Sequence, residues 1–282
     1  MEWKNRFSTT DAIKFRVICK KRIMEIDGDG EAALALSGGT DSITVLFSML
    51  DCGIKPHCYT FYMDGIISQD LKSSRKLSKD FNLELTEVPI ASDPDSIYED
   101  IKAVIPHCEK IKKTIIQCMI PWKYVYHAMS EKTIITGIGG DDLFGTQRKV
   151  QVAYHKMGDY GVAKWRKCYS DDLDFSAGNI AQYGKVYGKE NIDFYNTPMI
   201  FDYINQFSLG AINKPFMKAA SVMAFDDYYK KGAYYRDQTE HSYQINSRLR
   251  DLHDMLLESK YNLGGHKAII GLYNDIAKEM AR

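Results

Sequence analysis

A six-residue loop near the start of the chain combines the residue types that bind phosphate. It follows the apolar run AALAL, precedes the helix-like segment SITVLFSMLDCG, and consists of Ser37, Gly38, Gly39, Thr40, Asp41 and Ser42. A helix N-terminus presents unpaired N–H groups and partial positive charge, which attract phosphate. The two glycines let the backbone approach a phosphate without Cβ clashes, and the three hydroxyl groups add donors. The sequence therefore predicts a phosphate-binding loop.

The aspartate in this loop points to a metal ion. A carboxylate at position 41 repels phosphate unless a divalent cation lies between them, so Asp41 predicts Mg²⁺. The loop lacks the lysine of the G-x-x-x-x-G-K-[ST] pattern and is therefore not a Walker A site.

A second glycine-rich loop carries a pair of acidic residues. It spans residues 137–145, reads GIGGDDLFG and follows the apolar run TIIT. The carboxyl ends of parallel strands meet at one edge of a sheet, so we expect this loop to face the first one. Asp41 and Asp141 would then share one or two Mg²⁺ ions bound to phosphate oxygens. The alternative is a solvated turn that happens to hold two acids.

Alternating strands and helices must position these loops. Helical spacing occurs at 9–26, 70–82 and 95–130, the last interrupted at Pro106 and Pro121, and strand-like runs occur at 32–36, 55–65, 83–90 and 132–136. This alternation predicts an α/β fold with a parallel sheet and helices on both faces. From about residue 146 the strand signals fade, and 196–207, 214–232 and 242–281 have helical character.

The chain divides into three expected parts. Residues 1–31 form an N-terminal helix, 32–146 an α/β core that carries both loops, and 147–282 a helical subdomain on the substrate side, packed with the core as one domain.

Both loops resemble those of a known superfamily. The first resembles the PP-loop, S-G-G-x-D-S, of the ATP pyrophosphatases, which split ATP into AMP and pyrophosphate. The second is similar to the G-E-G-x-D-E-L-F-G-G segment in the synthetase domain of asparagine synthetases and β-lactam synthetases. The segment NTPMIFDYINQFSLGAINKPFMKAA resembles their K-x-x-L-R helix start, with Lys214 and Lys218 at the Lys and Arg positions.

The resemblance implies a cofactor set and a role for each matching residue. ATP would be bound with Mg²⁺, its phosphates by the six residues of the first loop and its metal by Asp41 and Asp141. Lys214 would stabilise charge on the adenylate and pyrophosphate, at the entrance of a helix whose first turn holds Pro215, and Lys218 and Asp142 are further catalytic candidates. The adenosine would be framed by Leu36, Phe61, Thr136 and Gly137.

The second loop departs from the family pattern at three positions. The family glutamate of G-E-G, implicated in amidation, is Ile138 here, the second acid of the D-E pair is the shorter Asp142, and the last loop glycine is Thr146. Only 36 residues precede Ser37, and Met1 is followed by Glu2 rather than a nucleophilic Cys, so we expect no glutaminase domain. Ammonia would come from solution or a separate glutaminase, or an amine, free or on a carrier protein, would serve instead.

Composition narrows the partners and the location. Lys plus Arg and Asp plus Glu both number 37, and this zero balance argues against a dedicated nucleic-acid binder. No apolar run approaches the roughly 18–20 residues that span a bilayer, and no signal-peptide core begins the chain, which favours a cytoplasmic protein without membrane contact. None of the six cysteines forms a C-x-x-C pair, which disfavours a cysteine zinc site.

Three functions remain in view. The leading one is an ATP-dependent ligase that adenylates a small-molecule carboxylate for attack by ammonia or an amine, giving an amide and AMP. The second is an RNA- or nucleobase-modifying PP-loop enzyme that adenylates a base oxygen for thiolation or amination. The third is a non-catalytic ATP-binding protein. Its only support is that Ile138 replaces the family glutamate.

Overall fold

Five parallel strands form the centre of the protein. The computed structural model describes residues 2–171, 176–232, 234 and 266–280. Its strands are β1 (Ala33–Ala35), β2 (Cys58–Met63), β3 (Leu85–Ile90), β4 (Thr133–Thr136) and β5 (Glu190–Asp193). They pair in the order β3-β2-β1-β4-β5, and every pairing is parallel. The predicted α/β class with a parallel sheet is confirmed.

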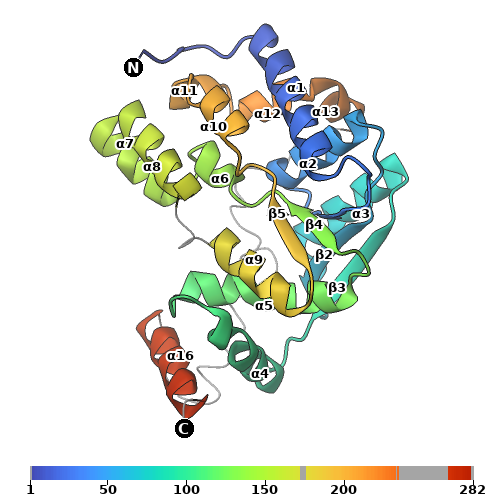
Figure 1. Cartoon of the computed structure of the whole chain (residues 1–282), viewed down its shortest axis with the longest axis vertical. Coiled ribbons are helices and arrows are strands. Elements are labelled where there is room, and N and C mark those ends of the chain that lie inside the picture. Colours follow the sequence, from blue (N-terminus) through green and yellow to red (C-terminus); the bar gives the residue numbers. More distant parts are fainter. Residues whose placement is uncertain (1, 172–175, 233, 235–265, 281–282) are drawn as a thin grey trace.

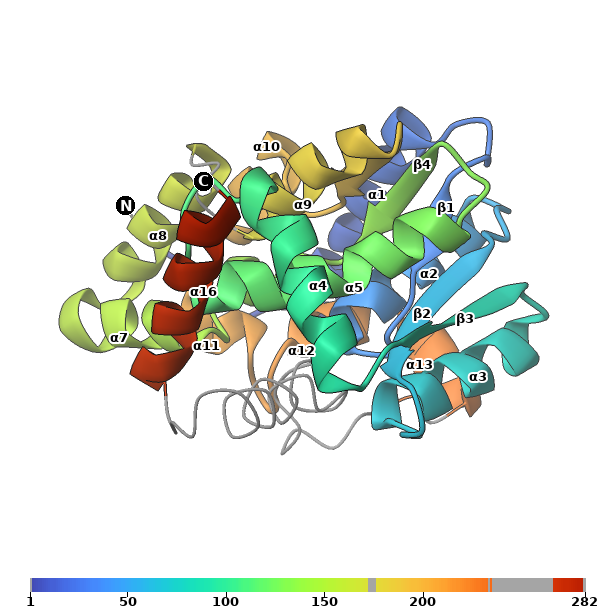
Figure 2. The same ribbon diagram turned by 90° about the horizontal axis from the view of Figure 1, so that it is seen from below.

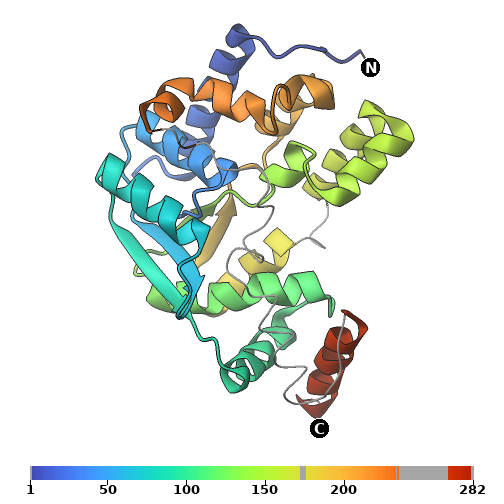
Figure 3. The same ribbon diagram turned by 180° about the vertical axis from the view of Figure 1, so that it is seen from behind.

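Two groups of helices cover the two faces of the sheet. Figures 1 and 3, seen from opposite sides, show one group above the sheet and the other below it. The first group comprises α1 (Thr9–Ile26), α2 (Thr40–Asp51), α3 (Gln69–Phe81), α10 (Pro198–Ile204), α12 (Ala219–Ala224) and α13 (Asp226–Gly232). The second comprises α4 (Pro94–Val104), the short 3₁₀ helix at Ile105–His107, α5 (Lys113–Ala128), α9 (Ser176–Val186) and α16 (His266–Met280), which Figure 2 views from below.

Four further helices complete the described part of the chain. They are α6 (Gly140–Leu143), α7 (Arg148–Met157), α8 (Asp159–Asp171) and α11 (Leu209–Ile212). Helices α7 and α8 lie beside each other at the periphery, with α6 between them and the sheet (Figure 1).

Burial on both faces explains the continuous apolar character of the first strand. Leu34 packs into the cluster under α1 and α2, whereas its neighbour Ala33 packs into the cluster under α4 and α5. Successive side chains of a strand point to opposite faces, so a strand covered on both sides must be apolar at every position.

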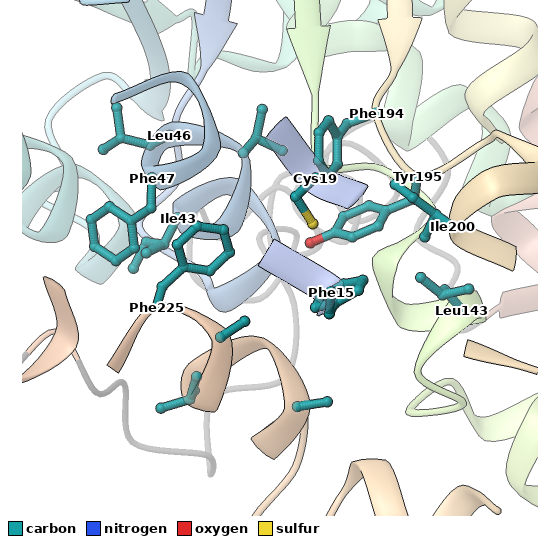
Figure 4. Close-up of a cluster of buried hydrophobic side chains, with 14 of the residues drawn as sticks. Phe15, Cys19, Ile43, Leu46, Phe47, Leu143, Phe194, Tyr195, Ile200 and Phe225 are labelled. Carbon is teal, nitrogen blue, oxygen red and sulfur yellow. The ribbon is translucent and has the colours of Figure 1, made fainter. Parts of the chain in front are cut away.

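Helix α1 packs into the apolar cluster on the first face of the sheet. Its N-terminus is closed by a capping box, in which Ser8 and Asp11 each satisfy the other's backbone N–H. Phe15 and Cys19 of α1 are fully buried and lie near Phe47 of α2 and near Phe225, which lies between α12 and α13 (Figure 4). One apolar cluster thus contains residues from 1–31, 32–146 and 147–282.

Two expectations about the elements are wrong. The second half of the chain is not purely helical, because β5 pairs with β4 along its whole length. This strand, ENID, is a half-exposed edge strand, so it lacks the apolar pattern that marks the others. Pro121 does not interrupt the helical region either, since α5 continues through it, whereas Pro106 does lie at a break.

Within the described ranges, no helix is both long enough and apolar enough to cross a lipid bilayer.

Candidate active site

The two glycine loops meet where the winding of the sheet reverses. From β1 the chain passes through α2 to β2 on one side, while β4 lies on the other side of β1. Ligands of such folds bind at this switch point, outside the carboxyl ends of the strands. The loops are in direct contact here, because a Cβ built on Gly137 would lie 2.8 Å from the carbonyl carbon of Asp41.

The first loop is held by its own hydroxyl groups. The Ser42 hydroxyl donates to the carbonyl of Gly39 (3.0 Å) and lies 3.2 Å from the Ser37 hydroxyl. Gly38 has φ +70°, and a Cβ at this position would lie 2.2 Å from the Cβ of Ser73 in α3. Helix α2 begins at Thr40 without a side-chain cap, so its first N–H groups have no partner within the helix. The loop therefore presents backbone donors, as the predicted phosphate site requires.

The second loop places its first acid opposite the first loop. Asp141 lies on α6, and the Thr146 hydroxyl donates to its Oδ1 over 2.6 Å. Gly140 packs against Asp41: a Cβ there would lie 2.3 Å from Cγ of Asp41. Any side chain at position 140 would therefore collide with the Asp41 carboxylate.

A lysine from a third segment joins the two acids. Nζ of Lys218 lies 2.6 Å from Oδ2 of Asp41 and 2.6 Å from Oδ1 of Asp141. The side chains of Lys218 and Asp41 are 12% and 19% exposed, whereas that of Asp141 is 49% exposed. The cluster is thus buried on one side and open at Asp141. We call these three residues the acid–lysine cluster.

Burial and the neighbouring charges shift the pKa values of Asp41 and Lys218. Burial raises the pKa of Asp41 to about 6; the Lys218 ammonium opposes this shift and the Asp141 carboxylate adds to it. Burial lowers the pKa of Lys218, but the two carboxylates outweigh it and hold that pKa above its ordinary value. Burial therefore works against the charged form of Asp41, and the Lys218 ammonium is the group that favours it.

The donor chemistry of the cluster fits Mg²⁺. Among the described residues, Oδ1 of Asp41 is a buried oxygen without a hydrogen-bond partner, and the side chain of Asp141 is half-exposed. The described ranges hold no group of three or more His, Cys, Asp or Glu that could enclose a metal by itself. Mg²⁺ usually takes one or two carboxylates and completes its shell with phosphate oxygens and water, which suits Asp41 and Asp141. Their role as metal ligands stays a prediction.

Asp142 is directed away from the acid–lysine cluster. Its two oxygens accept hydrogen bonds from Nε1 of Trp165 (2.8 Å) and Nε2 of Gln147 (2.6 Å). The side chain is buried, and burial raises the pKa of Asp142 to about 6. Asp142 thus joins the second loop to α7 and α8; a catalytic role for it stays a prediction.

The helix entrance expected at Lys214 is wrong. Helix α12 begins at Ala219, so neither Lys214 nor Pro215 lies in its first turn. Lys214 is exposed, whereas Lys218 immediately precedes the helix and reaches both acids. The helix starts about one turn later than the pattern K-P-F-M-K predicts, because no sequence signal marks the bend before Ala219.

The residues expected around the adenosine lie at the predicted edge of the sheet, but their side chains belong to opposite faces of the sheet. Phe61 packs against the apolar cluster under α4 and α5, whereas Leu36 is buried in the cluster under α1 and α2. Thr136 is buried at the end of β4, and Gly137 follows it. Because Leu36 and Phe61 belong to opposite faces, their side chains do not line one common surface.

Two site residues escaped the sequence analysis. The hydroxyl of Tyr195, just after β5, donates to the carbonyl of Asp41 over 3.2 Å, and its ring lies in the core beside Phe194 and Cys19 (Figure 4). Asn213 accepts a hydrogen bond from the backbone N–H of Lys218 (2.8 Å). Tyr195 and Asn213 each lie one residue before a predicted helical segment, at 196–207 and 214–232, and no motif includes either of them.

Comparisons with known proteins agree with this geometry. The sequence model of the family described as asparagine synthase matches residues 22–257, a range that includes both loops and Lys218. The match supports ATP-dependent synthetase activity of the ATP pyrophosphatase type. A segment of 67 residues is also 34% identical to 7-cyano-7-deazaguanine synthase from Archaeoglobus fulgidus, covering 24% of this chain and 28% of that relative. Since the family match extends over most of the chain, the protein belongs to the asparagine synthase family.

Proposed function

We propose that this protein is an AMP-forming carbon–nitrogen ligase: it adenylates a small-molecule carboxylate and passes the acyl group to ammonia or an amine. The observation that carries the proposal is the acid–lysine cluster, set between two glycine loops at the switch point of the sheet. A phosphate-binding loop, two carboxylates and a buried ammonium are the groups that a reaction at a triphosphate needs.

The first step is the transfer of AMP. An oxygen of the substrate carboxylate attacks the α-phosphorus of ATP, the bond from that phosphorus to the oxygen bridging to the β-phosphorus breaks, and pyrophosphate leaves. The N–H groups at the start of α2 hold the phosphates, and Lys218 neutralises the charge that builds up on the leaving oxygens. When Mg²⁺ is bound at Asp41 and Asp141, it supplies further neutralisation of phosphate charge.

The second step is acyl transfer. The nitrogen of ammonia or an amine attacks the acyl carbon of the adenylate, the bond to the AMP oxygen breaks, and the nitrogen loses a proton to give the amide. Ile138 occupies the position of the family glutamate and carries no proton-accepting group. The base for this step would therefore come from elsewhere, unless a donor or carrier protein supplies the amine already deprotonated.

The nature of the products tests the proposal. Purified protein is incubated with ATP and Mg²⁺ and a panel of carboxylic acids, and exchange of labelled pyrophosphate into ATP is measured. We expect exchange that depends on one acid of the panel and, once ammonia or an amine is added, AMP and never ADP as the nucleotide product. Production of ADP and phosphate by the wild-type protein, absent from Lys218→Met, would exclude the proposed chemistry.

A nucleobase-modifying enzyme is the second candidate, favoured by the local similarity to 7-cyano-7-deazaguanine synthase. The same assay separates the two when the panel includes purine-like carboxylic acids and RNA. Exchange stimulated by RNA and suppressed steeply by salt indicates the RNA-modifying function. A protein that binds ATP without releasing pyrophosphate with any acceptor is the non-catalytic alternative.

A further inference from the structure

The side chain of Asn213 connects the second acidic loop to the segment that carries Lys218. Its Nδ2 donates to the carbonyl of Phe144 (2.8 Å) and to the carbonyl of Leu209 (3.0 Å). Its Oδ1 accepts from the backbone N–H of Lys218 (2.8 Å). Two carbonyls and one N–H surround the amide, so only one orientation of its nitrogen and oxygen satisfies all three bonds.

Lys218 needs such support because its backbone is in an unfavourable conformation. Its φ is 58° and its ψ is 29°, in the left-handed region that residues with a Cβ rarely occupy. Such conformations persist where surrounding contacts fix them, and they concentrate at functional sites. The hydrogen bond from the Lys218 N–H to Asn213 is a contact of this kind, and it sets the direction in which the Lys218 side chain leaves the backbone.

The other end of the Asn213 amide is fixed to the acids. Phe144 directly follows α6, the helix that carries Asp141, so the bond to its carbonyl fixes Asn213 relative to that acid. Helices α11 and α12, which flank Asn213, lie close to α6 in Figure 1. One side chain thus joins the lysine segment to the acidic loop by hydrogen bonds.

We propose that Asn213 is a positioning residue that holds the ammonium of Lys218 between Asp41 and Asp141. It acts through Lys218 and need not touch the substrate. The consequence for turnover rests on the proposed function, whereas the consequence for the position of Lys218 does not.

The first experiment measures the position of Lys218 without any substrate. The full chain is treated with limiting formaldehyde and borane, and methylation of Lys218 is quantified by mass spectrometry relative to Lys123. Lys123 is a fitting internal reference because it forms its own ion pair of 2.6 Å with buried Asp100, on the other side of the sheet. In the wild type, Lys218 should react slowly, since two carboxylates and burial shield its ammonium.

Asn213→Ala should raise the rate ratio of Lys218 to Lys123 by about tenfold, the effect of losing roughly one hydrogen bond that holds the shielded conformation. Asn213→Asp should raise it as well, because its carboxylate keeps the acceptor for Lys218 but faces two carbonyls without a donor. Asn191→Ala is the matched control: Asn191 is also half-buried and donates one bond, to the Tyr126 hydroxyl, away from the site. It should leave the ratio unchanged.

An unchanged ratio in both Asn213 variants overturns the proposal. If Asn213→Ala unfolds, methylation of Lys123 becomes fast as well. Asn213→Ser, which keeps a hydroxyl at the site, then takes the place of Asn213→Ala and should also raise the rate ratio of Lys218 to Lys123. Equal acceleration in Asn191→Ala also overturns the proposal, because it would show a general loosening of the fold.

The second experiment asks whether Asn213 acts through Lys218. Turnover is measured for Asn213→Ala, Lys218→Met and the double variant. We expect Asn213→Ala to lower kcat with little change in KM for ATP, and to have no further effect once Lys218 is Met. Additive losses assign Asn213 a merely structural role. If no variant or wild type releases pyrophosphate, the proposed function fails while the methylation result still stands.

Discussion

Lys218 and Asp41 are 177 positions apart in the chain, and Nζ of the one lies 2.6 Å from Oδ2 of the other. The pair joins the first glycine loop to the segment that directly precedes α12. With Asp141 at the same distance from the ammonium, the pair forms a buried charge cluster that gives the site its electrostatic character.

Exchanging the two candidate lysines tests which of them serves the reaction. Lys218→Met should lower kcat/KM for pyrophosphate release by at least two orders of magnitude, about 3 kcal/mol, because the ammonium next to the phosphates is lost. Lys214→Met should change it by less than about twofold, since Lys214 is an exposed side chain outside the cluster. Steady-state assays of both variants show which lysine serves the reaction. Unchanged activity in Lys218→Met together with lost activity in Lys214→Met would assign the catalytic role to Lys214.

Metal binding in the absence of nucleotide should depend on the same lysine. Its ammonium already neutralises the two carboxylates, so Lys218→Met should bind Mn²⁺ about tenfold more tightly than the wild type, measured from free Mn²⁺ by electron paramagnetic resonance. Adding Asp41→Asn to this variant should remove the gain. Equal affinity in the wild type and Lys218→Met would show that the two acids are not the metal site.

The close approach of Gly140 to Asp41 predicts a sharp steric effect. Gly140→Ala places a methyl group 2.3 Å from Cγ of Asp41. The Asp41 carboxylate must then shift, and its ion pair with Lys218 is disturbed. We expect a loss of about 1–3 kcal/mol in stability and a large loss of turnover. Gly271→Ala in α16 is the control, because nothing lies within 4 Å of the added methyl, and it should stabilise the helix by up to about 1 kcal/mol. Comparable thermal melts and rates for the two variants would contradict this account.

The stability of the fold should depend on pH through Glu131, which precedes β4 at the edge of the sheet opposite the site. Burial raises its pKa, but hydrogen bonds from Tyr59 (2.7 Å) and His57 (2.6 Å) outweigh this, and the net pKa is lowered. A carboxyl group with a lowered pKa stabilises the fold above its ordinary pKa, and the effect is lost as the pH falls through the folded value. Glu131→Gln should therefore cost about 2 kcal/mol at pH 7 and progressively less below the ordinary value of 4.5.

Urea unfolding at pH 7 and pH 3 measures this difference. Other charged groups face the network, since Glu84 lies 3.8 Å from His57 and Lys189 donates to the carbonyl of Glu131. They are the same in both proteins, so the variant isolates the carboxyl group. Glu99→Gln, at an exposed position, should have little effect at either pH. An equal loss at both pH values would assign the stabilisation to packing instead.

The site was predictable to the extent that local rules govern it. Glycine loops after apolar strands, combined with the geometry of parallel sheets, place Asp41 and Asp141 on adjacent loops, and the structure brings both to one ammonium. The lysine segment follows no such rule. Lys218 takes a left-handed conformation that usually belongs to glycine, and its partner Asn213 has no feature that marks it among other asparagines. The contacts of Tyr195 likewise arise only from tertiary packing.

The late strand β5 has a consequence for the chain while it is still incomplete. Until residues 190–193 have been made, β4 is an edge of the sheet, and its sequence TIIT is β-branched throughout, without charge or proline. Such an edge is a template for pairing with other chains. The opposite edge, β3, is protected at all times by Glu87 and the exposed Pro89. A fragment that stops before Glu190 should therefore aggregate. In the complete chain, β5 covers the edge of β4 and prevents β4 from pairing with other chains.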